Sequence, residues 1–428
     1  MKSHITHRIC TTIGALVALI STGWSDLAQA TPRMSLTSGT PCLACHTNPT
    51  GGGGRTELGW SSMSNVGAIT YEDVGLSPDE TNMLVDGLLS IGLDIRVQGA
   101  RLGSPTIDES TNETVYPDMT FFPMQFQPYV TVTPAEGLTI YGTYLPGPDS
   151  FKGDNGVCDP VFAGMACYEG YVMYEPDTTW PTVRAGVFQP AIGIRHDDHT
   201  MLIRGDANDR RRPIIAPNYA EPGIELITQP VTWFRVEAGG YQPAGLDDAL
   251  NEGTKTADLA PMAYNLRVSF TPYIAIPIEV EAEDDGFDDF DDFGDEPETE
   301  DYIINSWFGA SAYGSGDFLM VNGFVGLGIH EGVSFVAETS YSQRTIDYTT
   351  FNNMVGLWYT PIPWLSTAIR YEYATTALAN DRMAKTQALV AGLEFFPTPY
   401  MEVRPEYRLV ETDAYRFGHA TVQIHLFY

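Results

Sequence analysis

The stretch Cys42-Leu43-Ala44-Cys45-His46 carries the residue types and the spacing of a covalent haem site. Two thiols three positions apart suit thioether bonds to the two vinyl groups of one haem. The adjacent imidazole of His46 then lies under the ring, where it ligates the iron. The pattern C-x-x-C-H therefore predicts one covalently bound haem c, held by Cys42 and Cys45 and ligated by His46.

Two other chemistries use a pair of cysteines at this spacing. A thioredoxin-like redox pair needs a strand–helix context after a βαβ pattern, and none is visible in the sequence. Half of a zinc site needs two or more further Cys or His ligands nearby, and none occurs before Cys158. Haem attachment is thus the favoured interpretation for an exported chain.

The first thirty residues have the organisation of a secretory signal peptide. Lys2 and Arg8 form the charged start, residues 9–20 form an apolar run, and Ala28-Gln29-Ala30 is an A-x-A cleavage site. The apolar run is too short to span a membrane. We therefore expect residues 1–30 to be removed and the mature chain to begin near Thr31, outside the cytoplasm.

The mature chain holds two cysteines beyond the haem motif, Cys158 and Cys167, with a loop-like segment between them. In an oxidising compartment we expect them to form a local disulfide. Two free surface thiols are the alternative.

Residues 31–89 form a small unit around the haem motif. The run Gly51–Gly54 allows the backbone to approach a flat ligand closely. Two interpretations stay open: a loop wrapped on one haem edge with Arg55 near a propionate, or a flexible linker. The order Ser77-Pro78-Asp79-Glu80 predicts the start of a helix that continues through Met83, Leu84, Leu88 and Leu89.

From Ile91 onward, apolar and polar residues alternate strictly. The stretches 91–98, 264–270 and 401–409 each place apolar side chains on one face and charged or polar side chains on the other. No helices are available to cover the apolar face of so many strands. The pattern therefore predicts strands with an apolar face toward lipid and a polar face toward a wet lumen. The last strand ends in Tyr428 and resembles the assembly signal of Gram-negative outer-membrane barrels.

The alternation predicts an all-β fold: a 16-stranded antiparallel transmembrane β-barrel over residues 90–428, preceded by the small haem segment. An even strand number puts both termini on the periplasmic side. Aromatic residues such as Trp307, Trp358, Tyr359 and Trp364 are expected in the interfacial girdles. The expected strands are 90–102, 119–133, 137–145, 168–175, 182–193, 223–230, 232–242, 262–273, 303–313, 318–329, 332–343, 350–360, 364–375, 385–396, 399–411 and 417–428.

As an architecture, the mature chain resembles the fused outer-membrane cytochrome–porins, in which one N-terminal C-x-x-C-H haem precedes a barrel. The specific residues of this resemblance are Cys42, Cys45 and His46. The best known members pass electrons from extracellular ferrous iron to the periplasm. The resemblance implies an electron-transfer conduit in the bacterial outer membrane, with an extracellular metal-ion donor and a periplasmic c-type cytochrome as partners.

Two other functions stay open beside the conduit. The barrel is either a transport porin with the haem segment as plug or sensor, or an anchor for a periplasmic electron carrier. No catalytic residue is assigned, and whether the chain acts as an enzyme on ferrous iron is left open. The net charge of −32 argues against a nucleic-acid partner.

The sixth iron ligand is left open between methionine and histidine. The haem segment contains no second histidine, so its candidates are Met34, Met63 and Met83. His425 alternates with lipid-facing residues near the periplasmic end and is the candidate from the barrel. A lumen histidine that faces water is the favoured alternative for His425.

Two charged connections are candidates for further roles. Residues 281–301 hold thirteen acidic residues and no basic one, which suits a solvated turn or a docking surface for a basic periplasmic cytochrome. Strand parity puts this run at the periplasm; an external cation-gathering loop is the third option. The resemblance implies that residues 194–222 fold inward and narrow the pore, as in sixteen-stranded porins. Plausible ligands there for a first-row metal ion are His196, Asp197, Asp198 and His199.

Overall fold

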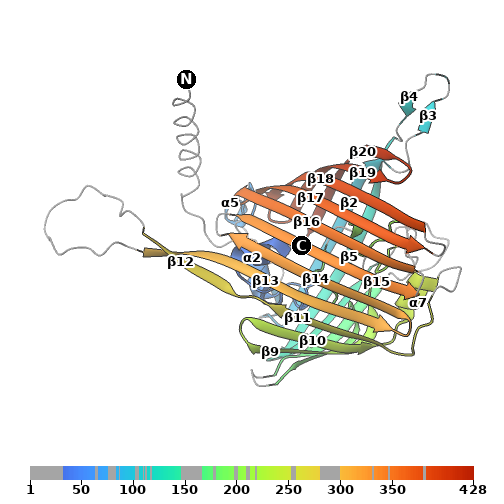
Figure 1. Cartoon of the computed structure of the whole chain (residues 1–428). Helices are drawn as coiled ribbons and strands as arrows, with labels where there is room; N and C mark the ends of the chain where they lie inside the picture. Colours follow the sequence, from blue (N-terminus) through green and yellow to red (C-terminus); the bar gives the residue numbers. More distant parts are fainter. Residues whose placement is uncertain are drawn as a thin grey trace, which may run out of the picture.

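Alternating side chains from Leu89 onward form one antiparallel sheet that closes on itself (Figure 1). The computed structural model describes residues 32–62, 66–75, 83–85, 87–101, 106–108, 110, 113–115, 118–145, 166–176, 180–196, 201–208, 213–216, 219–251, 257–279, 299–329, 332–345, 348–378 and 382–428.

The wall of the barrel has sixteen strands, as the alternation predicts. The sheet closes because β2 pairs with both β20 and β5: Ile95 lies opposite Leu426 on one side and Phe126 on the other. β11 and β12 pair with successive parts of β13, so together they count as one strand of the wall. The strands are β2 (Leu89–Arg101), β5 (Met119–Ala135), β6 (Leu138–Tyr144), β7 (Tyr168–Tyr174), β8 (Thr182–Phe188), β9 (Glu221–Val231), β10 (Phe234–Tyr241), β11 (Ala263–Phe270) with β12 (Tyr273–Glu279), β13 (Thr299–Ser315), β14 (Phe318–Ile329), β15 (Val333–Thr345), β16 (Tyr348–Ile362), β17 (Leu365–Leu378), β18 (Arg382–Thr398), β19 (Met401–Thr412) and β20 (Arg416–Phe427).

The two faces of the wall differ in polarity. On β19, Tyr407 is 51% exposed on the outer face, whereas Glu402 is 6% exposed on the lumen side. Leu266, Leu357 and Ile369 likewise point outward from three other strands. Since apolar side chains cover the outside and charged side chains line the inside, the barrel is built to stand in lipid. No helix among the described residues is long and apolar enough to cross a membrane.

Four short helices from the N-terminal segment pack against the lumen wall. They are α2 (Pro32–Ser38), α3 (Cys42–Cys45), α4 (Glu57–Ser61) and α5 (Tyr71–Val74), and we call residues 32–75 the plug. Leu36 and Trp60 are both fully buried. Leu36 packs against Phe324 and other wall residues of β14–β16, and Trp60 belongs to a core cluster with Tyr129 and other wall tyrosines. The plug is therefore part of the barrel's own hydrophobic core.

The helix expected from Ser77 is wrong over the residues that the structure describes. Met83 and Leu84 form β1 (Met83–Leu84), which pairs with Ser90 and Leu89 of β2. Residues 76–82, where the predicted helix begins, lie outside the described residues. At Met83 and Leu84, strand pairing with β2 therefore outweighs the local preference of the sequence for a helix.

The connection from β8 to β9 folds into the lumen, as expected for residues 194–222. It contains η2 (Leu202–Arg204), which is held by the opposite wall. The Leu202 amide donates to Glu372 Oε2 at 2.6 Å, and Ser340 Oγ donates to the Ile203 carbonyl at 2.6 Å. Asp206 accepts a hydrogen bond from Thr376 at 2.8 Å. We call residues 189–220 the inward loop.

One end of the lumen carries a further element. Helix α7 (Ala244–Asn251) lies at the end of the barrel opposite α5 (Figure 1). Its buried Leu246 and Leu250 join the same core cluster as Tyr241, Tyr313 and Phe318. A two-stranded hairpin, β3 (Thr106–Asp108) with β4 (Glu113–Val115), extends the connection after β2.

The acidic connection itself falls outside the described residues over 280–298. Its flanks are described: β12 pairs with residues 299–305 of β13, and the two project past the barrel edge (Figure 1). The alternation of strand directions places this connection at the same end as the turns at 136–137 and 399–400, as the strand parity predicted.

Candidate functional site

The C-x-x-C-H motif lies on a single helical turn followed by a tight hairpin. Cys42 and Cys45 begin and end α3, so their side chains leave neighbouring positions of one turn. The His46 amide donates to the Cys42 carbonyl at 2.9 Å, and His46 then turns extended and bridges to Arg55. The His46 side chain is buried. The motif is thus held rigidly against its own following loop.

The glycine run closes this hairpin against the barrel wall. Gly51, Gly52 and Gly53 have positive φ angles of 90°, 76° and 68°. A Cβ at Gly53 would come 2.7 Å from Tyr141 Oη, and one at Gly54 would come 2.7 Å from Thr131 Oγ1. Glycine is therefore required both by the turn and by the close approach of the plug to the wall.

Arg55, expected near a haem propionate, has a different environment. Its guanidinium lies over the rings of Trp60 and Phe427, at 4.9 and 4.7 Å from their centroids. The side chain is buried between the plug and the last strand. Arg55 therefore joins these two parts by cation–π contacts.

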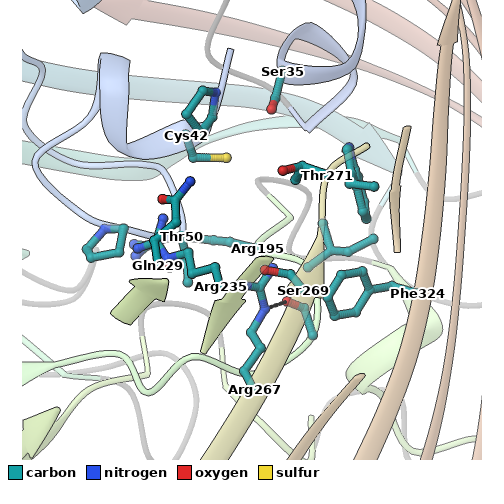
Figure 2. Close-up of a pocket in the computed structure, with 15 residues that line it drawn as sticks. Ser35, Cys42, Thr50, Arg195, Gln229, Arg235, Arg267, Ser269, Thr271 and Phe324 are labelled. Atoms are coloured by element: carbon teal, nitrogen blue, oxygen red, sulfur yellow. Dashed lines mark hydrogen bonds between the residues drawn. The ribbon is translucent and has the colours of Figure 1, made fainter. Parts of the chain in front are cut away.

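A cavity opens inside the lumen beside Cys42 (Figure 2). The empty space between its lining residues amounts to about 740 Å³, counted together with the solvent at its open side. Figure 2 shows the Cys42 side chain above this space and three arginines below it. The lining comes from the plug, the inward loop and β9–β14: Ser35, Pro41, Cys42, Pro49, Thr50, Gly193, Ile194, Arg195, Gln229, Arg235, Arg267, Ser269, Thr271, Trp307 and Phe324.

The charges around this cavity are unevenly matched. Arg267 donates to Glu237 Oε2 at 2.6 Å and to the Gly193 carbonyl at 3.1 Å. Arg235 lies against the same carboxylate, with Nε 3.1 Å from Glu237 Oε1. Arg195 is 3.7 Å from Glu169. Two arginines thus share one glutamate, which leaves the cavity wall net positive.

The two thiols have environments that keep them protonated. Burial raises the pKa of the Cys42 thiol, although Arg267 and Arg235 act in the opposite direction. Burial also raises the pKa of the Cys45 thiol, against a hydrogen bond with Ser62. Both cysteines are free of disulfides, as thioether formation requires.

The residues around the cavity fit a haem c. Trp307 and Phe324 supply aromatic surface for a flat apolar macrocycle, and the arginines supply cations for its two carboxylates. Cys42 opens into the cavity, and Cys45 and His46 follow within the same short hairpin. These residues would hold the group; the prediction of one covalent haem c stays a prediction.

Two candidates for a sixth ligand, Met34 and His425, do not belong to the cavity lining. Met34 is buried with Val66, Phe396 and Phe427 in a separate cluster. Met83 begins β1, and Met63 lies outside the described residues. His425 faces the lumen from β20 as predicted, with Nδ1 3.3 Å from Glu402 and Nε2 3.6 Å from Asp94.

The proposed metal-binding residues of the inward loop are described only in part. His196 Nε2 lies 2.8 Å from Glu338 Oε2 on β15. Asp197, Asp198 and His199 lie outside the described residues. Within the described part of the chain, no three His, Cys, Asp or Glu side chains are grouped to hold a metal ion. The metal site therefore stays a prediction.

Only one of the two cysteines expected to form a disulfide belongs to the described residues. Cys167, just before β7, is buried and is disulfide-bonded rather than a titrating thiol. Cys158 lies outside the described residues. The pairing of Cys158 with Cys167 stays a prediction.

Three tryptophans expected in the membrane girdles face inward instead. Trp307 lines the cavity and packs with Phe324, while its neighbour Phe308 is 45% exposed on the outer face. Trp358 packs against the cluster around Leu36, and Trp364 packs against the cluster around Met34. Strand parity, followed one residue at a time, would have assigned Trp307 to the lumen.

Comparisons with known proteins identify the barrel. No protein-family model matches the chain, and no curated protein matches it in sequence. Among solved structures, OprB of Pseudomonas putida aligns over 86% of this chain and 100% of its own, with a TM-score of 0.50 and 12% identity. The channel DcaP of Acinetobacter baumannii covers 79% of this chain and 97% of its own, with a TM-score of 0.48 and 9% identity.

An anion-selective porin from Comamonas acidovorans aligns over 79% of this chain and 98% of its own, with a TM-score of 0.44 and 12% identity. At such identities the likeness to OprB concerns the fold alone, which is the closed sixteen-stranded barrel of outer-membrane porins. The likeness supports the porin half of the expected architecture and gives no support to the cytochrome half.

Proposed function

We propose that this chain is a porin-type barrel of the bacterial outer membrane whose lumen is closed by its own haem-binding plug. We propose further that it conducts electrons rather than solutes. The observation that carries the proposal is the Cys42 side chain, which opens into a cavity inside the lumen lined by aromatic and arginine side chains. A haem c bound there would supply reversible one-electron chemistry at a site shielded by the barrel wall.

The packing of the lumen supports conduction without solute flow. One continuous core cluster joins Trp60 of the plug, Ile214 of the inward loop and Leu246 of α7 to the wall tyrosines. These tyrosines contact one another in sequence; the ring centroids of Tyr141 and Tyr171 lie 5.0 Å apart. We propose that this packing keeps water from passing through the barrel along the core cluster.

The plug residues have separable tasks in this proposal. Cys42 and Cys45 would hold the macrocycle, and His46 would ligate the iron. Gly53 and Gly54 allow the hairpin to lie directly on the wall. The donor would be an extracellular metal ion such as ferrous iron, and the acceptor a periplasmic c-type cytochrome.

The acidic connection is the proposed docking surface for that cytochrome. Its thirteen acidic residues over 281–301 would attract a basic partner before contact, which speeds encounter at low salt. It joins the wall at the end of the barrel that also holds the turns at 136–137 and 399–400. Deletion of residues 283–300 should slow electron transfer to a basic cytochrome at low salt, and salt-independent transfer would contradict docking.

A transport porin is the second candidate, and the structural comparisons favour it over electron transfer. OprB shares the barrel, and this chain has the inward loop expected of sixteen-stranded porins. In that function the plug acts as a gate or sensor and must leave the lumen for solute to pass. A barrel that only anchors a periplasmic electron carrier is the third alternative.

Purified protein in liposomes separates these functions. Ferrous iron is added outside, haem absorbance is followed, and release of an entrapped small solute is measured in the same vesicles. The Cys42→Ala variant serves as the control, because it keeps the barrel and lacks one thioether. Haem reduction without solute release supports the conduit. Solute release with no haem reduction supports the porin, and absence of covalent haem in the wild type rejects the conduit.

A further inference from the structure

Two guanidinium groups on the cavity wall have unmatched donors. Arg235 Nη2 is buried and has no hydrogen-bond acceptor within the described part of the chain. The same holds for Arg195 Nη1, on the inward loop. Both side chains line the cavity beside Cys42. A buried charged donor without an acceptor is unfavourable, so a ligand that supplies an acceptor would be stabilised there.

The third arginine of the cavity, Arg267, has hydrogen-bond acceptors for two of its donors. Arg267 donates from Nη1 to Glu237 and from Nε to the Gly193 carbonyl. Glu237 accepts a hydrogen bond from Arg267, and its other oxygen lies 3.1 Å from Arg235 Nε without forming a hydrogen bond. Glu169, 3.7 Å from Arg195 Nη2, leaves Nη1 of that residue unmatched. The cavity therefore offers two separate cationic donors.

The two donors come from different parts of the chain and line the same cavity. Arg235 comes from β10, and Arg195 comes from the inward loop. Arg195 also lies against the plug, because a Cβ built on Gly52 would be 2.9 Å from Arg195 Nε. Trp307 and Phe324 supply apolar surface in the same cavity. A ligand that combines an apolar surface with anionic groups would match this lining.

We infer that Arg195 and Arg235 bind the two propionates of the haem attached at Cys42 and Cys45. The inference rests on the proposed haem function and adds the residues that orient the group within the lumen. Arginine binds carboxylates through paired, charge-assisted hydrogen bonds, which fix orientation as well as charge. Their positive charge beside a bound haem would favour its reduced form and would raise the reduction potential.

The test measures the reduction potential of the purified, detergent-solubilised protein by optical redox titration. The variants are Arg195→Gln, Arg235→Gln and the double variant, with Arg195→Lys and Arg235→Lys as conservative changes. The matched control is Arg344→Gln, which removes a lumen charge that pairs with Asp206 away from the cavity. Heat-dependent mobility on gels reports whether each barrel has folded.

Each glutamine variant should lower the potential relative to wild type, and the double variant should lower it further. The propionate ionisation, seen as a pH-dependent step in the potential, should move to higher pH because the carboxylates lose their cations. The lysine variants should fall between wild type and glutamine, and Arg344→Gln should leave both readouts unchanged. If folded glutamine variants titrate like Arg344→Gln, the propionate assignment is overturned while the haem function stands. If the wild type holds no covalent haem, the proposed function itself fails.

Discussion

Arg184 on β8 donates a hydrogen bond from Nη1 to Oδ1 of Asn48 at 2.9 Å, and so joins the barrel wall to the plug two residues after His46. The same guanidinium donates from Nη2 to Glu225 at 2.6 Å and lies 3.9 Å over the Phe188 ring. Arg184 is fully buried. Its position is fixed by the wall, so Asn48 is the part of the contact that moves with the plug.

Replacing Asn48 with alanine should loosen the plug without disturbing the wall. A hydrogen bond to a buried charged group contributes about 1.5–3 kcal/mol, so the undocked plug should become roughly ten- to hundredfold more populated. Transient openings in planar lipid bilayers, counted per minute, measure this population. Ser61→Ala is the control, because Ser61 is exposed and bonds only within α4. Equal opening rates in both variants would mean that Asn48 does not latch the plug.

The glycine hairpin offers a matched pair of substitutions. Gly53 and Gly75 both have φ of +68°, but a Cβ at Gly75 meets nothing within 4 Å, whereas one at Gly53 lies 2.7 Å from Tyr141 Oη. Both alanine variants should cost about 1–2 kcal/mol from the left-handed backbone. Gly53→Ala should cost more, because it also pushes the hairpin off the wall.

Thermal unfolding followed by tryptophan fluorescence measures this difference. Adding Tyr141→Phe should recover part of the loss in the Gly53→Ala protein, because the nearest atom is then the ring carbon at 3.2 Å. A melting temperature for Gly53→Ala equal to that of Gly75→Ala would show that the hairpin does not press on Tyr141.

The thiol of Cys42 should be slow to react in protein produced without haem. Only the thiolate is nucleophilic, and burial raises the pKa of Cys42, so the thiolate fraction at pH 8 is smaller than in a free cysteine. The alkylation rate should keep rising tenfold per pH unit beyond the ordinary thiol range. Arg235→Gln should slow the reaction further, since Arg235 lowers this pKa. Iodoacetamide labelling with mass spectrometry gives the rate for Cys42, and urea-unfolded protein should return to the ordinary profile.

Removing both histidines of the inward loop tests the external entry site. His196→Ala with His199→Ala should slow haem reduction by ferrous iron and leave reduction by dithionite intact. His196 is bonded to Glu338 at 2.8 Å, so the single His196→Ala variant also frees a carboxylate. Glu338→Gln is therefore the companion variant. Wild-type rates with both reductants would place the entry site elsewhere.

His425 is expected to be a bonded lumen residue rather than an iron ligand. Both of its ring nitrogens face carboxylates, those of Glu402 and Asp94. His425→Ala should therefore leave the low-spin optical spectrum of the haem unchanged. Loss of the low-spin bands in a folded variant would identify His425 as the sixth ligand.

The barrel could be predicted because side chains alternate between the two faces of a strand, so the polarity of a half-buried strand repeats every two residues. β14 runs over Phe318–Ile329, the range that the alternation predicts. The strand expected over 182–193 ends at Phe188, because the chain turns inward there and Gly193 adopts a positive φ of 52°. Local alternation cannot reveal such a turn, since the inward loop is held by contacts with strands more than a hundred residues away.

The candidate site was predictable only where its residues are adjacent in sequence. Cys42 and His46 form a local motif, whereas Arg235 and Trp307 reach the same cavity from different strands. Their meeting depends on the register of the closed sheet, which the sequence pattern does not specify. Trp307 was expected at the membrane interface from its residue type, although its position in the alternation of β13 assigns it to the lumen side.

The burial of Leu36 and Trp60 in the lumen also bears on the order of assembly. A wall closed without the plug would present Tyr129, Tyr141 and Phe324 to water, so the segment and the wall gain stability from each other. In the proposed function, haem attachment would need access to both thiols, which belong to the plug inside the closed wall. Maturation of the segment in the periplasm should therefore precede insertion, and a haem-free chain would reach the membrane with an incomplete core.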